Sequence, residues 1–96
     1  SFAVAESLTR NGAANISLAD ARTRSGSEAE VDTIIATTFP DSALGAPRRG
    51  EMAAAMMTPG WTIRVSAGGR EFEYRANPRQ VRLVAPDGEN VVVFPV

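Results

Sequence analysis

The sequence predicts an α+β fold, with one or two short amino-terminal helices packed on a four- to five-stranded antiparallel sheet. Two parts of the chain with different composition and residue patterns predict this fold. Residues 1–26 are rich in Ala, Ser, Asn and Asp and carry no long strand pattern. Residues 30–96 alternate short runs of β-favouring residues with Pro and Gly, as strands joined by turns do. We therefore expect a single domain over residues 1–96, mainly helical over 1–26 and antiparallel over 30–96.

The amino-terminal stretch carries signals for two short helices. Apolar side chains recur at helical spacing at Phe2, Ala5 and Leu8. Asn11-Gly12 is typical of a helix end. A second helix is expected from Ser17, because Ser17 and Asp20, three residues later, resemble a capping box. Gly26 would end that helix.

Two segments precede the first clear turn. Val31–Phe39 is rich in Val, Ile, Thr and Phe and is followed by Pro40, which indicates a strand. Glu51–Met57 is ambiguous, because Ala and Met favour a helix whereas the span is short and bounded by Gly50 and Pro59-Gly60.

The next segment predicts a β-hairpin with a defined register. Residues 61–65 and 71–75 alternate with period two on either side of Gly68-Gly69. A two-residue turn there places Val65 opposite Phe72, Ile63 opposite Tyr74 and Arg64 opposite Glu73. Apolar pairs then share one face and an ion pair lies on the other. A slip by one residue would exchange the faces, so the agreement is specific.

A second hairpin is predicted near the carboxyl end. Val81–Ala85 and Val91–Val93 flank Asp87-Gly88, a strong hairpin turn signal. The unbroken apolar run from Val91 to Phe94 indicates a strand that is covered on both faces or paired with another chain. Oligomer formation or strand exchange through Val91–Val96 is therefore one expected interaction.

The composition excludes several classes of function. The 96 residues contain no histidine or cysteine, and all ten cationic side chains are arginine. No imidazole or thiolate can bind a transition metal, and no Ser/His pair, Cys/His pair or Schiff-base lysine can form. A formal net charge of −1 lacks the basic excess typical of nucleic-acid binding. No apolar run approaches the ~20 residues that span a bilayer. We expect a chain that is not an enzyme and has no catalytic residue, metal or cofactor.

Three motifs occupy the middle of the chain. They are Pro40-Asp41-Ser42-Ala43-Leu44-Gly45-Ala46-Pro47 with Gly50, Thr58-Pro59-Gly60-Trp61-Thr62-Ile63, and Phe72-Glu73-Tyr74-Arg75. Over about residues 30–76 they resemble a small uncharacterised domain of exported and lipoprotein-associated bacterial proteins, with the pattern W-P-D-S-S-L-G-C-P-x-P-G, T-P-G-Y-x-I and Y-E-Y-H. The resemblance implies a helix followed by antiparallel strands. It also implies an extracytoplasmic location, either secreted, periplasmic or lipid-anchored before processing, and no known activity.

The chain departs from that pattern at three positions. Ala46 replaces the usual cysteine, Phe39 the tryptophan and Arg75 the histidine. A role that needs that thiol or imidazole is therefore absent. In the pattern, the stretch equivalent to Glu51–Met57 is extended, and for this reason we expect a strand there.

The segment from Pro40 to Arg49 is the predicted partner-binding site. Its candidate residues are Asp41, Ser42, Leu44, Arg48 and Arg49. Asp41 and Ser42 most often form an Asx-type turn at such a place, and a rigid loop held by prolines can also present a recognition surface. We expect Leu44 and the two arginines to be accessible. Ser42 has no base to activate it as a nucleophile.

Other polar residues have simpler explanations than catalysis or metal binding. Glu71 and Glu73 could form a hydrolytic carboxylate pair, but arginine neighbours such as Arg64 and Arg75 would favour the ionised form, whereas a general acid must hold a proton. Asp87, Glu89 and Asn90 could bind calcium, but the hairpin turn already explains them. Trp61 and the methionines Met52, Met56 and Met57 are expected to fill the core.

The sequence favours a non-catalytic, extracytoplasmic protein-binding module. Its protein partner would bind the Pro40–Arg49 loop or a sheet edge, and inhibition of an enzyme is a specific version, since a rigid loop beside a small sheet can enter a cleft. A structural subunit of an exported envelope assembly, with Val91–Val96 donated as a strand, is one alternative. A carboxylate-dependent hydrolase is the disfavoured alternative.

Overall fold

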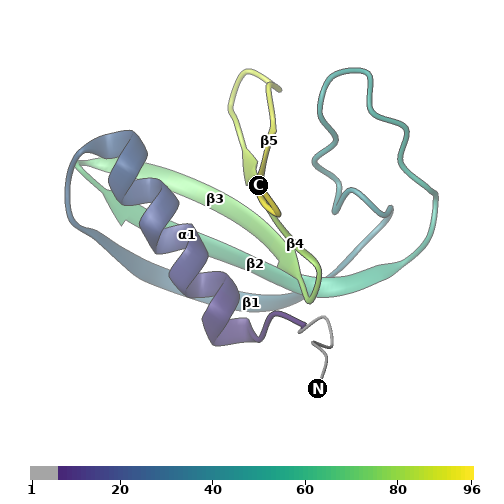
Figure 1. Ribbon diagram of the computed structural model, residues 1–96, viewed down its shortest axis with the longest axis horizontal. Coiled ribbons are helices and arrows are strands. Elements are labelled where there is room, and N and C mark those ends of the chain that lie inside the picture. Colours follow the sequence, from purple (N-terminus) through teal and green to yellow (C-terminus); the bar gives the residue numbers. More distant parts are fainter. Residues whose placement is uncertain (1–6) are drawn as a thin grey trace.

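The computed structural model describes residues 7–96. Helix α1 precedes five strands, and their bounds are α1 Arg10–Ser25, β1 Ala29–Phe39, β2 Thr58–Ala67, β3 Arg70–Asn77, β4 Gln80–Val84 and β5 Val91–Phe94. The strands form one antiparallel sheet in the order β1-β2-β3-β4-β5. Figure 1 shows α1 lying across one face of this sheet. The α+β class and the antiparallel sheet are confirmed.

There is one helix over Arg10–Ser25, so a helix end at Asn11-Gly12 and a second start at Ser17 are wrong. The hydroxyl of Thr9 caps the helix by accepting a hydrogen bond from the Gly12 N–H at 2.9 Å, which places Gly12 in the first turn. Ser17 lies buried in mid-helix, where its hydroxyl donates to the Ala13 carbonyl. Gly26 ends the helix as predicted, in a left-handed conformation with φ 69°. Phe2 and Ala5 lie outside the described residues.

Small side chains allow α1 to approach the sheet closely. Its buried residues are Ala13, Ala14, Ser17 and Ala21. They pack on a core formed mainly by alternate residues of β2, β3 and β4, including Ile63, Val65, Phe72, Tyr74 and Val81. The Tyr74 hydroxyl donates to Asp20 of the helix at 2.7 Å, and its burial raises the pKa of this phenol. Helix and sheet are thus joined by apolar packing and by the hydrogen bond between Tyr74 and Asp20.

The predicted register of the β2–β3 hairpin is confirmed. Val65 lies opposite Phe72, Ile63 opposite Tyr74 and Arg64 opposite Glu73. The turn at Gly68-Gly69 has positive φ at both residues, which glycine adopts without steric cost. Arg64 and Glu73 form an ion pair at 3.4 Å on the face opposite the helix. Trp61 is partly buried and packs against the core.

The predicted carboxyl-terminal hairpin is also present as β4 and β5. The four residues of β5 are each half-buried. Among residues 7–96, β5 and β1 each pair with a strand on one side only. Both therefore form edges of the described sheet.

The expected strand over Glu51–Met57 is wrong, because β2 begins at Thr58, where it pairs with Phe39 of β1. Residues 40–57, here called the 40–57 segment, instead fold back over the face opposite α1. Their contacts with that face include a hydrogen bond from the Gln80 side chain to the Ser42 carbonyl at 2.8 Å. Figure 1 shows this segment beside the β4–β5 hairpin. Phe39 is the last residue of β1, so an extended stretch over residues 51–57 would have no part of β1 opposite it.

Candidate functional site

Asp41 and Ser42 hold the backbone of the 40–57 segment. One carboxylate oxygen of Asp41 accepts hydrogen bonds from the N–H groups of Ala43 and Gly45, each at 2.9 Å. The Ser42 hydroxyl accepts from the Ala54 N–H, and the Ser42 N–H donates to the Ala54 carbonyl, both at 2.9 Å. The expected Asx-type turn is present. These two polar side chains thus serve to order the segment internally.

Leu44 is fully buried, so the expectation that it is accessible is wrong. Its φ of 58° is left-handed, which is costly for a residue with a Cβ. Arg75 stabilises this turn, because its Nη1 donates to the carbonyls of Leu44 and Gly45, both at 3.1 Å. A Cβ on Gly45 would lie 2.7 Å from that nitrogen. The segment is therefore attached to the sheet at this turn through Arg75 of β3 and buries the Leu44 side chain.

A bidentate ion pair fixes the middle of the segment. Arg82 of β4, 5% exposed, donates to both carboxylate oxygens of Glu51, at 2.7 and 2.8 Å. It also donates to the Ala46 carbonyl at 3.1 Å and to the Gln80 side chain at 2.7 Å. Glu51 accepts a further hydrogen bond from the Arg48 N–H at 2.8 Å. The side-chain hydrogen bonds from Arg82, then that N–H, lower the pKa of Glu51 to about 2.

Acid is expected to weaken this attachment. The folded pKa of Glu51, about 2, lies below its ordinary value of 4.5. The stability that the ion pair contributes is therefore fully present above pH ~4.5 and is lost as the pH falls toward about 2. Glu51→Gln should remove this part of the pH dependence, whereas Glu89→Gln, at an exposed ion pair, should leave it. Denaturant unfolding between about pH 6 and pH 2.5 measures both slopes, and equal slopes for wild type and Glu51→Gln would contradict the assignment.

Arg48 and Arg49 are exposed, as expected. Arg49 pairs with Glu89 in the turn between β4 and β5. Nearby, the Asn90 side chain donates to the Pro47 carbonyl at 3.0 Å. This end of the segment is thus attached to the β4–β5 hairpin. Of the predicted partner-binding residues, these two arginines are the ones that the structure leaves available to a partner.

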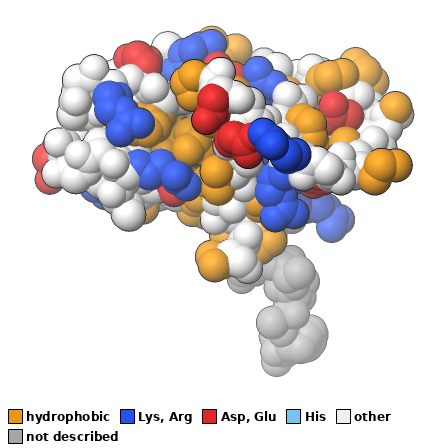
Figure 2. All heavy atoms as spheres, turned by 90° about the horizontal axis from the view of Figure 1, so that it is seen from above, with side chains coloured by type: hydrophobic (Ala, Val, Ile, Leu, Met, Phe, Trp, Pro, Cys, Tyr) orange, Lys and Arg blue, Asp and Glu red, His pale blue; other side chains and the backbone are white. Residues whose placement is uncertain are grey.

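The three methionines do not fill the core, so that expectation is wrong. Met52 is 95% exposed, Met56 56% and Met57 70%. We call these three side chains the methionine surface. Figure 2 shows hydrophobic side chains gathered at the right-hand end of the molecule, where the 40–57 segment lies. The segment therefore buries Ala43, Leu44 and Ala46 and presents the three methionines to solvent.

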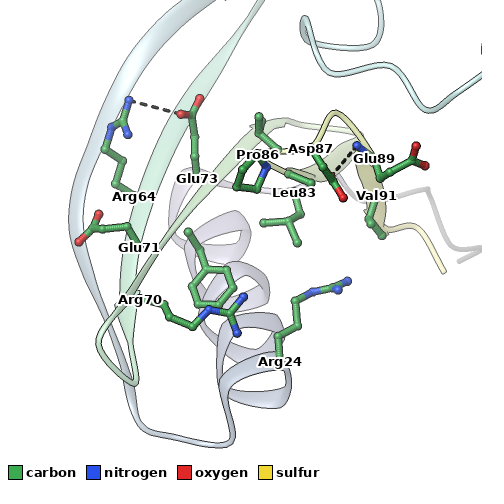
Figure 3. Close-up of a pocket in the computed structure, with 13 residues that line it drawn as sticks. Arg24, Arg64, Arg70, Glu71, Glu73, Leu83, Pro86, Asp87, Glu89 and Val91 are labelled. Carbon is green, nitrogen blue, oxygen red and sulfur yellow. Dashed lines mark hydrogen bonds and ion pairs between the residues drawn. The ribbon is translucent and has the colours of Figure 1, made fainter.

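A cleft of about 850 Å³ lies between the start of β3, the end of α1 and the β4–β5 turn. The cleft exists because β3 extends beyond its partner strand β4. The β3–β4 pairing ends at Glu73 opposite Val84, whereas β3 begins at Arg70. Glu71 would next face Pro86, which has no N–H to continue the ladder. Figure 3 shows the residues that line it, and Arg70 lies over the ring of Phe72, 4.7 Å from its centroid.

The carboxylates that line the cleft all have hydrogen-bond or ion-pair partners. Glu73 pairs with Arg64 and Arg75, and Glu89 pairs with Arg49. Glu71 accepts from the Ser66 hydroxyl at 2.7 Å, and Asp87 accepts from the Glu89 N–H at 2.9 Å. Within residues 7–96, no group of three or more Asp or Glu could hold a metal ion. The cleft thus offers no free carboxylate pair for general acid–base chemistry.

The residues that attach the segment to the sheet were not predicted from the sequence. Arg75 and Arg82 lie on the face opposite the core, as period two requires, and each reaches backbone carbonyls of the 40–57 segment. A signal was present in Val81-Arg82-Leu83, where one arginine interrupts an apolar strand. It could not show that a loop covers that arginine.

A family model described as Domain of unknown function (DUF8738) matches residues 12–85. This range runs from α1 to the residue after β4 and includes the 40–57 segment. No curated protein and no solved structure matches the chain. None of the helices over the described range is long and apolar enough to cross a membrane.

Proposed function

The chain belongs to the family described as Domain of unknown function (DUF8738), and from that premise we propose that it is a non-catalytic protein-binding module that binds its partner through the methionine surface. The observation that carries the proposal is the exposure of Met52, Met56 and Met57 on a segment that is otherwise attached to the sheet. Large apolar side chains that gather at the surface are typical of interaction sites.

The attachment of the segment supports this role energetically. The side chains that connect it to the sheet or to itself include Asp41, Arg75, Gln80 and Arg82. Because the backbone is ordered before binding, less conformational entropy is lost on association. The methionine side chains themselves remain adaptable, with several rotatable bonds and a polarisable sulfur. A fixed backbone with adaptable side chains suits a protein surface.

The exposed arginines complement the apolar contact. Arg48 and Arg49 lie on the same segment as the methionine surface. Arginine binds carboxylates in bidentate geometry, and arginine and methionine are both enriched at protein interfaces. A partner with an apolar patch bordered by acidic side chains would match this arrangement. Inhibition of an enzyme by insertion of the segment into a cleft is the more specific form of the proposal.

An extracytoplasmic location is part of the proposal, and its support is the resemblance of the central motifs to exported bacterial domains. The alternative of a hydrolase is weakened by the pairing of Glu73 with two arginines. The alternative of a structural subunit draws its support from β1 and β5, which are edge strands of the sheet that residues 7–96 form.

The three methionines make the proposal directly testable, because the chain contains no others. Replacing methionine by its diazirine analogue places a photo-crosslinker only at positions 52, 56 and 57. We expect ultraviolet light to crosslink one protein partner from an envelope extract of the source organism. Binding of that partner, once purified, should weaken at least tenfold when all three methionines become serine. The melting temperature should change little, because the side chains are exposed.

A matched control comes from Val96→Ser, which removes another fully exposed apolar side chain outside the segment. That variant should bind like wild type. Arg48→Glu with Arg49→Glu should also weaken binding with little effect on stability. Unchanged affinity of the triple serine variant would contradict the proposal. So would loss of the crosslink when unlabelled triple variant is added in excess, because that variant should compete poorly for the partner.

A further inference from the structure

Strand β1 is an edge of the sheet with a row of backbone groups that face away from β2. In the two-residue turn at Gly68-Gly69, Ala67 and Arg70 form the closing hydrogen-bonded pair. Alternation along β2 then directs the backbone of Arg64, Thr62 and Gly60 toward β1, opposite Thr33, Ile35 and Thr37. The N–H and C=O groups of the intervening residues therefore face outward. These residues are Ile34, Ala36 and Thr38.

This outward row lacks the devices that usually protect an edge strand. Charged side chains, prolines and bulges normally prevent edge-to-edge pairing. The first half of β1 has them, with Glu30, Asp32 and a bulge between Val31 and Thr33. Residues 33–39 carry no charge, proline or glycine, and Ile35 among them is 54% exposed. Among residues 7–96 no strand pairs with this side of β1, so its second half offers an uncharged template for another strand.

The uncharged stretch is centred on a residue whose backbone faces outward, and this arrangement suits pairing with an identical stretch. We propose that a second copy of this chain pairs with β1 in antiparallel orientation, across a two-fold axis at Ala36. Residue 36 is the midpoint of the uncharged stretch 33–39, and its backbone faces outward. Ala36 would then lie opposite Ala36 of the second copy, and Ile34 opposite Thr38. Each such pair exchanges two hydrogen bonds, about six in all, and identical edges close as a dimer.

The ends of the stretch limit the ladder and avoid charge repulsion. In this register Asp32 lies opposite Pro40 of the second copy, which has no N–H. Residues 33–39 of one copy pair with residues 33–39 of the other, so no like charges lie directly opposite each other. The side chains of Ala36 and Thr38 are exposed, so α1 does not cover them and a second strand has room to pair there. The two five-stranded sheets would form one continuous sheet. This contact is separate from the methionine surface of the proposed function.

Charge replacement at Ala36 tests the pairing, because the axis brings residue 36 of both copies together. Sedimentation velocity and light scattering should give wild type a mass that rises with concentration from 10.2 kDa toward twice that value. Ala36→Lys and Ala36→Glu, each alone, should stay monomeric, since like charges directly opposite destabilise a strand pair. An equimolar mixture of the two variants should dimerise again. Ala19→Lys, on an exposed alanine of α1, should dimerise like wild type.

The outcomes separate this pairing from other arrangements. Thermal unfolding of the variants monitors their fold, which an exposed alanine should not affect. A wild-type chain that is monomeric up to about millimolar concentration overturns the proposal. So does a dimer that persists in Ala36→Lys, which would place the contact at another edge such as β5. Failure of the mixed variants to recover the dimer overturns the two-fold register at Ala36.

Discussion

Replacing Val65 by aspartate is expected to lower the free energy of unfolding by about 4 kcal/mol, which is a large fraction of the stability of a small domain. Val65 is 0% exposed and lies opposite Phe72 on the helix-covered face of the sheet. The new carboxylate would have no cation beside it within the apolar core. Chemical denaturation followed by circular dichroism measures the loss.

The neighbouring position supplies the control. Arg64→Ala removes a half-exposed side chain of the same strand on the other face, together with its ion pair to Glu73. An exposed pair contributes at most about 1 kcal/mol. If Val65→Asp cost no more than Arg64→Ala, the assignment of the two faces would have to be abandoned.

Removing the Glu51 carboxylate is expected to have the second largest effect. Glu51→Ala leaves the guanidinium of Arg82, 5% exposed, without its anionic partner. Loss of one partner of a buried ion pair costs about 3 kcal/mol or more. Because Glu51 lies in the 40–57 segment, the methyl resonances of Met52, Met56 and Met57 should shift as well. Denaturant unfolding and methyl NMR of the same variant test both consequences.

A double variant distinguishes the charge from the packing. Glu51→Ala combined with Arg82→Met removes both charges and should recover part of the lost stability, since an apolar side chain tolerates this burial. Glu89→Ala, at the exposed ion pair with Arg49, should cost less than about 1 kcal/mol. Equal losses in Glu51→Ala and Glu89→Ala would mean that the Arg82 contact does not hold the segment.

Local sequence signals predicted the sheet well. The turn at Gly68-Gly69 and the alternation of residues 61–65 and 71–75 were enough to predict the β2–β3 register. Both signals act between neighbours in the chain, so they do not depend on distant contacts. The helix boundaries were less predictable, because Asn11-Gly12 can end a helix or occupy its first turn. The cap at Thr9 decided this.

The location of the candidate site in the chain was predicted, but the orientation of its side chains was not. The sequence indicated a rigid loop at Pro40–Arg49, and its Asx-type turn is present. It assigned Leu44 to the surface and the methionines to the core, and both assignments are reversed. Residues without periodicity carry no signal for which side chains face inward. That choice depends on where the segment lies relative to the sheet.

By itself, the sequence determined the class of the fold, the register of the β2–β3 hairpin and the absence of imidazole, thiol and amine side chains, because these follow from composition and from short-range geometry. Only the tertiary structure decided which face of the sheet the 40–57 segment covers. Arg75 and Arg82 attach it there through carbonyls and a carboxylate about 30 residues away along the chain. Such long-range hydrogen bonds bury Leu44 and leave the methionine surface exposed, and local propensity does not encode them.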